Sequence, residues 1–189
     1  MLNTKAFRKL GVVAALVLSA ALITGCGHTV LPKQVLLVKG YETISLSGAA
    51  LILVNAEKDS SDLAIATPEG GASALRANRQ AWTKALVESL SSELAKRGAR
   101  LSSRASLRMS ISLPEILVSQ TKESYQFKVK VLIVSSTGWS KKFEGSAESE
   151  LRSLETVFAM MDRLAGQALG EAVKAMLGDT DFLTHVRTR

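Results

Sequence analysis

The stretch FKVKVLIV, residues 127–134, decides the fold class, because apolar side chains fill its odd positions and lysines two of its even ones. A period of two is typical of a β-strand with one face in the core and the other in solvent. Residues 107–113 alternate in the same way, and residues 139–149 follow a Ser-Thr-Gly turn at 136–138. We therefore predict three consecutive strands, with Trp139, Phe143 and Ala147 facing inward on the third.

Two long helices are predicted, one before these strands in the sequence and one after them. Residues 75–97 carry an apolar stripe at four-residue intervals, at Trp82, Leu86, Leu90 and Leu94, and end at Gly98. Residues 153–177 repeat apolar side chains at intervals of three and four and end at Gly178. We place Trp82 and Phe158 on the helix faces that pack against the sheet. A short last helix, through Val186, is capped by the acidic segment 179–181.

The segments before the first helix complete the predicted sheet. Residues 34–39 and 49–57 are predicted strands, and the second is apolar on both faces, as a central strand would be. Residues 58–73 form a polar loop with room for a short strand at 63–66. The order of elements predicts an α+β fold: an antiparallel or mixed sheet of about four to five strands with two long helices packed on one face.

The N-terminus has the pattern of a bacterial lipoprotein signal peptide. Basic residues precede an uncharged run from Leu10 to Ile23, which is shorter than the roughly 20 residues of a membrane span. The run ends in a lipobox of Ile23, Thr24, Gly25 and Cys26, and Cys26 is the only cysteine of the chain. A peptidase that accepts small side chains would cut before Cys26, whose thiol carries the diacylglycerol and acyl chains such as palmitate. The alternative is an ordinary secretory signal followed by an accidental cysteine.

These boundaries predict a signal peptide at 1–25, a lipidated cysteine with a short linker at 26–33, and one domain at 34–189. Gly27, where an Asp would favour retention in the inner membrane, predicts a lipid anchor in the outer membrane, facing the periplasm. Cleavage lowers the formal net charge from +7 to about +4. Because an exported, tethered protein does not meet nucleic acid, the predicted partners are an envelope protein, anionic lipid or cell-wall polymer.

The chain resembles the YajG-like family of small Gram-negative lipoproteins, whose function is uncharacterised. The resemblance rests on the lipobox, LAKRG at 94–98, YQFKV at 125–129 and GDTDFLTHV at 178–186. These motifs are structural, so the resemblance implies a fold and a location but assigns no catalytic residue.

One candidate binding surface follows from the strand pattern. If residues 107–149 form a meander, the face opposite the helices carries four cations and two apolar side chains: Arg108, Lys128, Lys130 and Lys142, with Leu132 and Val134. This face is a basic platform for a partner, or a merely solvated sheet face.

The sequence contains few residues in patterns typical of catalytic or metal-binding sites. His28 is predicted to lie in the linker and His185 on the surface or in packing, while Asp59 and Asp62 lack the glycine and distal Glu of a calcium loop. The GxxxG at 166–170 favours close approach of the helix to its sheet, and the methionines are expected in the core. We see no catalytic constellation, cofactor motif or metal site, and expect no enzyme activity.

Two functions remain. The first is a non-enzymatic binding or structural module held by lipid at the periplasmic face of the outer membrane. The alternative is an accessory lipoprotein in lipid or lipopolysaccharide transport and assembly, by analogy of fold with the LptE-type lipoproteins.

Overall fold

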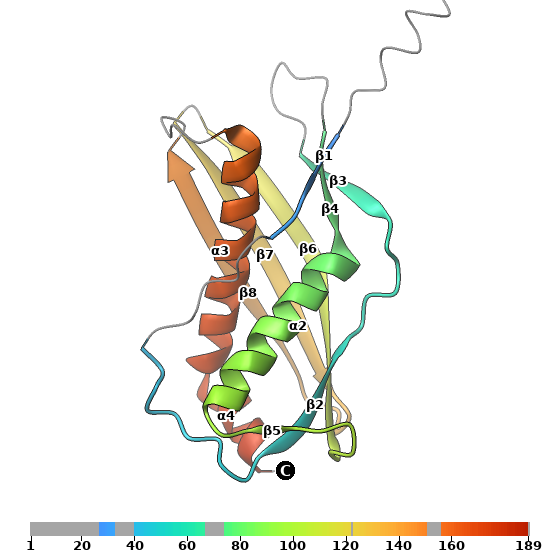
Figure 1. The fold of residues 1–189 in the computed structure, drawn as a ribbon, viewed down its shortest axis with the longest axis vertical. Helices are drawn as coiled ribbons and strands as arrows, with labels where there is room; N and C mark the ends of the chain where they lie inside the picture. Colours follow the sequence, from blue (N-terminus) through green and yellow to red (C-terminus); the bar gives the residue numbers. More distant parts are fainter. Residues whose placement is uncertain (1–26, 33–39, 67–73, 122, 151–155, 189) are drawn as a thin grey trace, which may run out of the picture.

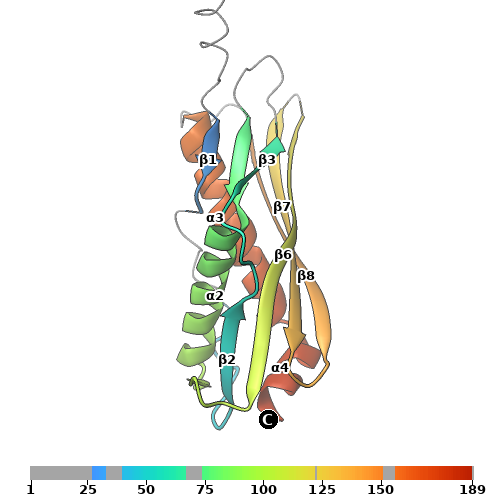
Figure 2. The same cartoon turned by 90° about the vertical axis from the view of Figure 1, so that its right-hand side faces the viewer.

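The computed structural model describes residues 27–32, 40–66, 74–121, 123–150 and 156–188, and these form a layer of strands covered by helices (Figures 1 and 2). The predicted signal peptide, the predicted strand at 34–39 and the first residues of the second predicted helix lie outside the described residues.

The main sheet has five strands in the order β5-β2-β6-β7-β8. Its antiparallel part is the predicted meander of β6 (Leu107–Gln120), β7 (Ser124–Ser135) and β8 (Ser140–Glu150). β2 (Ala50–Asn55) runs parallel to β6 and has the two residues of β5 (Arg100–Leu101) on its other side. The sheet is mixed, and β2 has a neighbour on each side as its apolar sequence predicts.

β6 is longer than the strand that the sequence predicts. Its pairing with β7 shifts register between Ser112 and Glu115. A bulge inserts an extra residue and so changes which positions face the core. Before the bulge the buried positions are odd, as at Ile111, and beyond it Ile116 is buried while Leu117 is exposed. Strict alternation alone predicts neither the added length nor this change.

A second, smaller sheet lies at the end of the molecule that contains the first described residues. It has the order β1-β4-β3, with β1 (His28–Val30) parallel to β4 (Leu75–Asn78) and β3 (Asp62–Ala66) antiparallel to it. β3 confirms the predicted short strand. Two predictions are wrong here, because residues 28–30 were expected in a linker and residues 75–78 in a helix. Three to four residues are too few to show a period, and pairing with neighbouring strands determines their conformation.

Both long helices pack on the same face of the main sheet (Figure 2). α2 (Arg79–Lys96) begins where the Asn78 side chain accepts a hydrogen bond from the amide of Ala81, and it is followed by Gly98 at φ +93°. α3 (Val157–Leu177) begins after Thr156, and α4 (Thr180–Arg187) is capped by Asp179, as predicted. The C-terminus lies at the opposite end of the molecule from β1 (Figure 1).

The core confirms one of the two aromatic placements. Trp82 is fully buried with the rest of its stripe, and its ring lies 6.0 Å from that of Phe127. Phe158 was expected in the core and is 48% exposed, beside Val157 at 44%. The first turn of α3 lies beside β1 rather than against the main sheet, because the ring of Phe158 stacks on His28.

Candidate functional site

β1 holds the residues that follow Cys26 firmly in the fold. The indole Nε1 of Trp82 donates a hydrogen bond to the carbonyl oxygen of Val30 at 2.8 Å. The amide of Leu31 donates to Asp162 Oδ1 at 3.0 Å, and the hydroxyl of Thr29 donates to Asp62 Oδ2 at 2.6 Å. These contacts come from α2, α3 and β3, so the folded domain begins within two residues of Cys26.

His28 is part of this arrangement rather than of a linker. Its ring stacks on Phe158 with 4.3 Å between centroids, and its Nε2 lies 3.3 Å from Asp162 Oδ1. The carboxylate of Asp162 is 7% exposed and lies one turn of α3 beyond Phe158. His28 therefore joins β1 to the first turns of α3.

Gly27 has a close neighbour on β4. A Cβ atom at this position would lie 2.8 Å from Arg76 Nε and 3.0 Å from the carbonyl oxygen of Ala74. A larger residue therefore requires the Arg76 side chain to move, and an acidic one would meet its guanidinium. From the sequence we predict only a sorting role for Gly27, because its packing against Arg76 depends on the pairing of β1 with β4.

The outer face of the main sheet carries the predicted binding residues. We use this name for the outward positions of the meander: Arg108, Ser110, Ser112, Glu115, Leu117, Gln126, Lys128, Lys130, Leu132, Val134, Lys142, Glu144, Ser146 and Glu148. All four predicted cations are there, as are Leu132 and Val134, of which Val134 is 41% exposed.

The outer face is not uniformly basic, because glutamates on neighbouring strands pair with two of its lysines. Lys128 Nζ lies 2.9 Å from Glu144 Oε2, and Lys130 Nζ lies 2.7 Å from Glu115 Oε2. The hydrogen bond to Glu115 raises the pKa of Lys130, and the bond from Lys128 lowers the pKa of Glu144. A glutamate on a neighbouring strand therefore compensates each of these two lysines.

Arg108 and Lys142 differ from these lysines, since neither makes an ion pair within the described part of the chain. In the ladder, Leu132 lies opposite Lys142 on one side and Ser112 on the other. Ile52 and Val54 of β2 extend the same surface, in register with Arg108 and Ser110. The result is an apolar patch with a cationic margin, which we call the distal patch: Ile52, Val54, Leu132 and Val134, with Arg108 and Lys142.

The distal patch lies toward the end of the sheet that is remote from β1. Arg108 is the second residue of β6 and Lys142 the third of β8, and both strands begin at the end where the C-terminus lies (Figure 1). The parallel pairing of β2 with β6 determines the face on which Ile52 and Val54 lie. The sequence alone could therefore not place these two residues in the distal patch.

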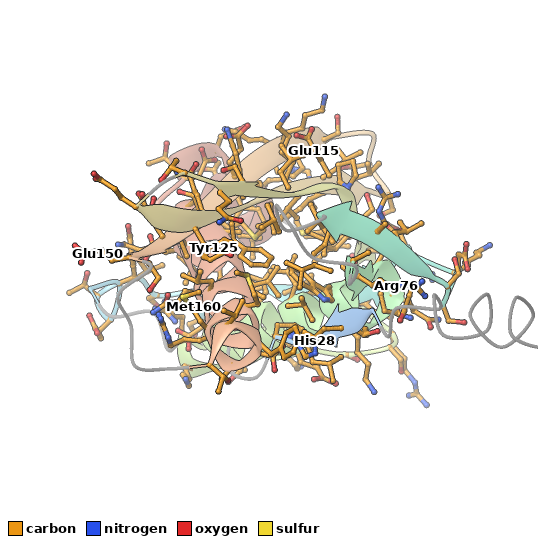
Figure 3. All side chains as sticks on the ribbon, turned by 90° about the horizontal axis from the view of Figure 1, so that it is seen from above. His28, Arg76, Glu115, Tyr125, Glu150 and Met160 are labelled. Atoms are coloured by element: carbon orange, nitrogen blue, oxygen red, sulfur yellow. The ribbon has the colours of Figure 1, made fainter. Side chains whose placement is uncertain are left out.

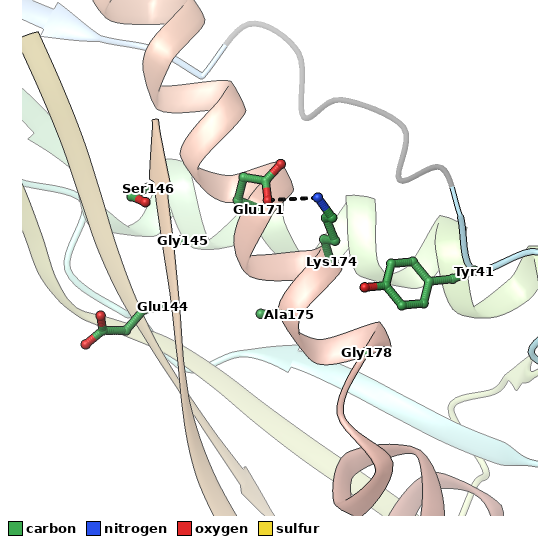
Figure 4. A pocket seen from close by; sticks show the side chains of 8 residues that line it. All are labelled: Tyr41, Glu144, Gly145, Ser146, Glu171, Lys174, Ala175 and Gly178. Carbon is green, nitrogen blue, oxygen red and sulfur yellow. Dashed lines mark ion pairs between the residues drawn. The ribbon is translucent and has the colours of Figure 1, made fainter. Parts of the chain in front are cut away.

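A second candidate site is an open groove of about 440 Å³ at the free edge of the main sheet (Figure 4). It lies between β8 and the second half of α3, and both polar and small apolar residues line it: Tyr41, Glu144, Gly145, Ser146, Glu171, Lys174, Ala175 and Gly178. Lys174 and Glu171 pair across 3.4 Å within it. In the described ladders β8 pairs only with β7, so backbone groups of an 11-residue strand remain available along this edge.

The remaining candidate residues serve the fold. His185 stacks on Trp139 at 4.8 Å, and Lys141 Nζ lies 2.9 Å from Asp179 and 3.2 Å from Asp181, which fastens α4 to the last hairpin. The hydrogen bond to Asp179 raises the pKa of Lys141. Asp62 accepts from β1, as described above. Across the described ranges no group of three or more metal-ligating side chains occurs, and no helix is long and apolar enough to cross a bilayer.

No family model matches the chain, and no curated protein matches it. Solved structures resemble it in fold. A protein of family DUF330 from Xanthomonas campestris has a TM-score of 0.48 and 14% identity, covering 82% of this chain and 98% of its own. A minor lipoprotein from Acinetobacter baumannii has a TM-score of 0.45 and 11% identity, covering 77% of this chain and 93% of its own. A hypothetical protein from Chlamydia trachomatis has a TM-score of 0.41 and 8% identity, covering 75% and 96%. The resemblance to the YajG-like family stays a prediction.

Proposed function

We propose that this protein is a lipid-anchored lipoprotein of the Gram-negative envelope, attached through Cys26 at the periplasmic face of the outer membrane, and that it binds a partner rather than catalysing a reaction. The observation that carries the proposal is the position of β1. Cleavage before Cys26 removes none of the described elements and leaves a cysteine one residue before the fold. The predicted lipobox thus ends two residues before β1, the first described element.

The anchor determines which surfaces face the periplasm. Lys142 lies eight residues before the end of β8, or about 26 Å along the strand at roughly 3.3 Å per residue. Charges act over about 8 Å at physiological salt. The unpaired cations of the distal patch therefore act on a periplasmic partner, and not on the membrane that holds the anchor. Apolar side chains with a cationic margin suit an amphipathic partner that carries negative charge.

Replacing the anchor cysteine tests the first half of the proposal. Cys26→Ser removes the only thiol that can take a diacylglycerol, so labelling with a radioactive fatty acid should be lost and the protein should leave the membrane fraction. A variant that still labels and still sediments with membranes would show that the lipobox assignment is wrong.

The sorting role of Gly27 needs a control for its packing. We expect Gly27→Asp to move the protein toward the inner membrane, while Gly27→Asn, which fills the same space beside Arg76, should leave it in the outer membrane. If both variants fractionate alike, the effect of position 27 is structural and not a sorting signal.

Site-specific crosslinking distinguishes the two functions. A photoreactive residue at Val134 should capture a periplasmic partner in cells, whereas one at Lys84, exposed on α2, should capture none. A third probe at Ser146, on the free edge of β8, tests the alternative. Capture of a transmembrane β-barrel there would favour an accessory subunit of a transport assembly. Equal labelling at all three positions would contradict a defined binding surface.

A further inference from the structure

We propose that the anchor-proximal end of the domain rests directly on the bilayer, with Phe158 and Val157 in the interfacial region and Arg76 against anionic headgroups. This inference rests on the proposed lipid anchor at Cys26 and goes beyond it, since it assigns a membrane-contacting surface on the folded domain. The two apolar residues form the first turn of α3, directly after the cap at Thr156.

The distance between the anchor and Phe158 carries the argument. Consecutive Cα atoms are about 3.8 Å apart, so Cys26 lies within about 7 Å of the backbone of His28. The ring of His28 lies 4.3 Å from that of Phe158. β1 is held by hydrogen bonds from α2, α3 and β3, so the chain cannot lift the domain away on a free tether. An acyl group on Cys26 therefore enters the bilayer beside an exposed Phe and Val.

These side chains have the properties of a surface in contact with lipid. Val157 and Phe158 are 44% and 48% exposed although they belong to a helix whose other apolar residues are almost all buried. Aromatic side chains favour the interfacial region of a bilayer, and burial of apolar area there adds to lipid anchoring. The charge of Arg76 is a second observation that points to the same surface, and it does not depend on the exposure of Val157 and Phe158.

Arg76 is exposed on β4 and adjoins Gly27, the residue next to the anchor. It makes no ion pair within the described residues. Figure 3, which looks onto this end of the molecule, shows Arg76 toward the same side as His28, with Glu150 across the end from it. A cation beside the anchor is attracted by anionic headgroups, whereas Glu150 is repelled. The domain therefore contacts the bilayer on the side of β1 and the first turn of α3.

The test uses the full lipidated protein, purified and reconstituted in phosphatidylethanolamine and phosphatidylglycerol vesicles with or without brominated acyl chains. In a Trp139→Phe background, the remaining native indole is Trp82, which is fully buried. Phe158→Trp then places a reporter at the proposed contact. The matched control is Val134→Trp, an exposed apolar position on the outer face toward the other end of the molecule.

We expect brominated lipid to quench more than about half of the emission of the indole introduced at position 158, because interfacial groups lie roughly 5–10 Å deep, and to leave that at position 134 unchanged. Adding Arg76→Gln should reduce the quenching at position 158 in anionic vesicles and not in vesicles of neutral lipid. Equal emission at position 158 with and without bromine would overturn the inference.

The mass of the N-terminal peptide separates the two proposals. A lipidated protein without quenching at position 158 overturns the membrane contact alone. A protein that carries no diacylglycerol overturns the anchor and, with it, the contact. Quenching of similar size at positions 134 and 158 would mean that the domain lies flat on the bilayer, which also contradicts the proposed orientation.

Discussion

A Cβ atom on Gly145 would lie 2.0 Å from the carbonyl oxygen of Ala168, so β8 and α3 meet there at backbone distance. The same atom would lie 2.5 Å from the amide nitrogen of Ala172. Real Cβ atoms do not approach backbone atoms this closely. Both obstructing atoms belong to the main chain of α3, which cannot move aside as a flexible side chain could. This contact sets how closely α3 packs on β8, the edge strand of the main sheet.

Gly145→Ala should therefore destabilise the domain strongly. Overpacking commonly costs about 1 to 3 kcal/mol, and we expect about 3 kcal/mol or more because neither backbone can yield. Urea unfolding followed by circular dichroism measures the change. The control is Ser146→Ala, the next residue on the same strand, whose exposed side chain should make the change nearly neutral. Equal stability of the two variants would show that α3 can move away without cost.

The two aromatic residues that the sequence placed in the core should now behave differently. Trp82→Ala should cost about 3 to 5 kcal/mol, since it removes a large buried side chain and its hydrogen bond to Val30. Phe158→Ala should cost less than about 1 kcal/mol, as expected away from the core. Denaturant melts of both variants test this. A large loss at Phe158 would contradict its exposure, and a small loss at Trp82 would contradict the orientation of α2.

The sequence predicted the meander and both helix stripes because each repeats its period over several turns or residues. It missed the start of α2, although Asn78 is a typical capping residue, because Leu75 and Ala77 also fit a helical stripe. It predicted close approach of α3 to its sheet from the GxxxG at 166–170, whose two glycines are buried. The structure shows a close approach of α3 to the sheet at Gly145 of the strand, which the sequence did not single out. An isolated glycine within a strand pattern is itself a signal of such an approach.

The candidate site was predictable only in part. Parity alone placed Arg108, Lys128 and Lys130 on one face, and this was right. The partner of Lys130 was not predictable, because the bulge in β6 brings Glu115 opposite it. Charges within one strand can be counted from the sequence, but their compensation depends on register between strands. β1 was not predictable for the same reason, because its three residues form a strand only by pairing with β4.

A buried ion pair at the end of α2 should make stability depend on pH. Glu93 lies 2.7 Å from both Lys96 and Arg97, and the side chains of Glu93 and Arg97 are 4% and 5% exposed. Burial raises the pKa of Glu93, but the bonds from Lys96 and Arg97 outweigh it and hold the pKa below its usual value of 4.5. Glu93→Gln leaves the buried Arg97 cation without its counter-ion, and should cost about 3 kcal/mol at neutral pH.

The sign of the pH effect follows from that lowered pKa. The unfolded state takes up the proton at a higher pH than the folded state, so the stabilisation is present above about 4.5 and is lost as the pH falls through the folded pKa. The difference in unfolding free energy between wild type and Glu93→Gln should therefore shrink between about pH 7 and pH 3. Glu88→Gln is the control on the same helix, since its pair with Lys84 is exposed and worth little. A difference that stays constant with pH would exclude the charge of Glu93 as the cause.

The outer face should bind anionic surfaces only through its unpaired cations. In unlipidated protein, carrying Cys26→Ser, we expect weak co-sedimentation with phosphatidylglycerol vesicles at 0.01 M salt, where charges act over about 30 Å, and loss of it at 0.15 M. Arg108→Gln with Lys142→Gln should weaken this binding by up to roughly thirtyfold, at about 1 kcal/mol for each cation. Lys130→Gln with Glu115→Gln removes an ion pair without changing the net charge and should leave binding unchanged. If removal of that pair weakens binding as much as removal of the two free cations, Lys130 acts directly on the lipid and the face is the basic platform that its lysines alone predict.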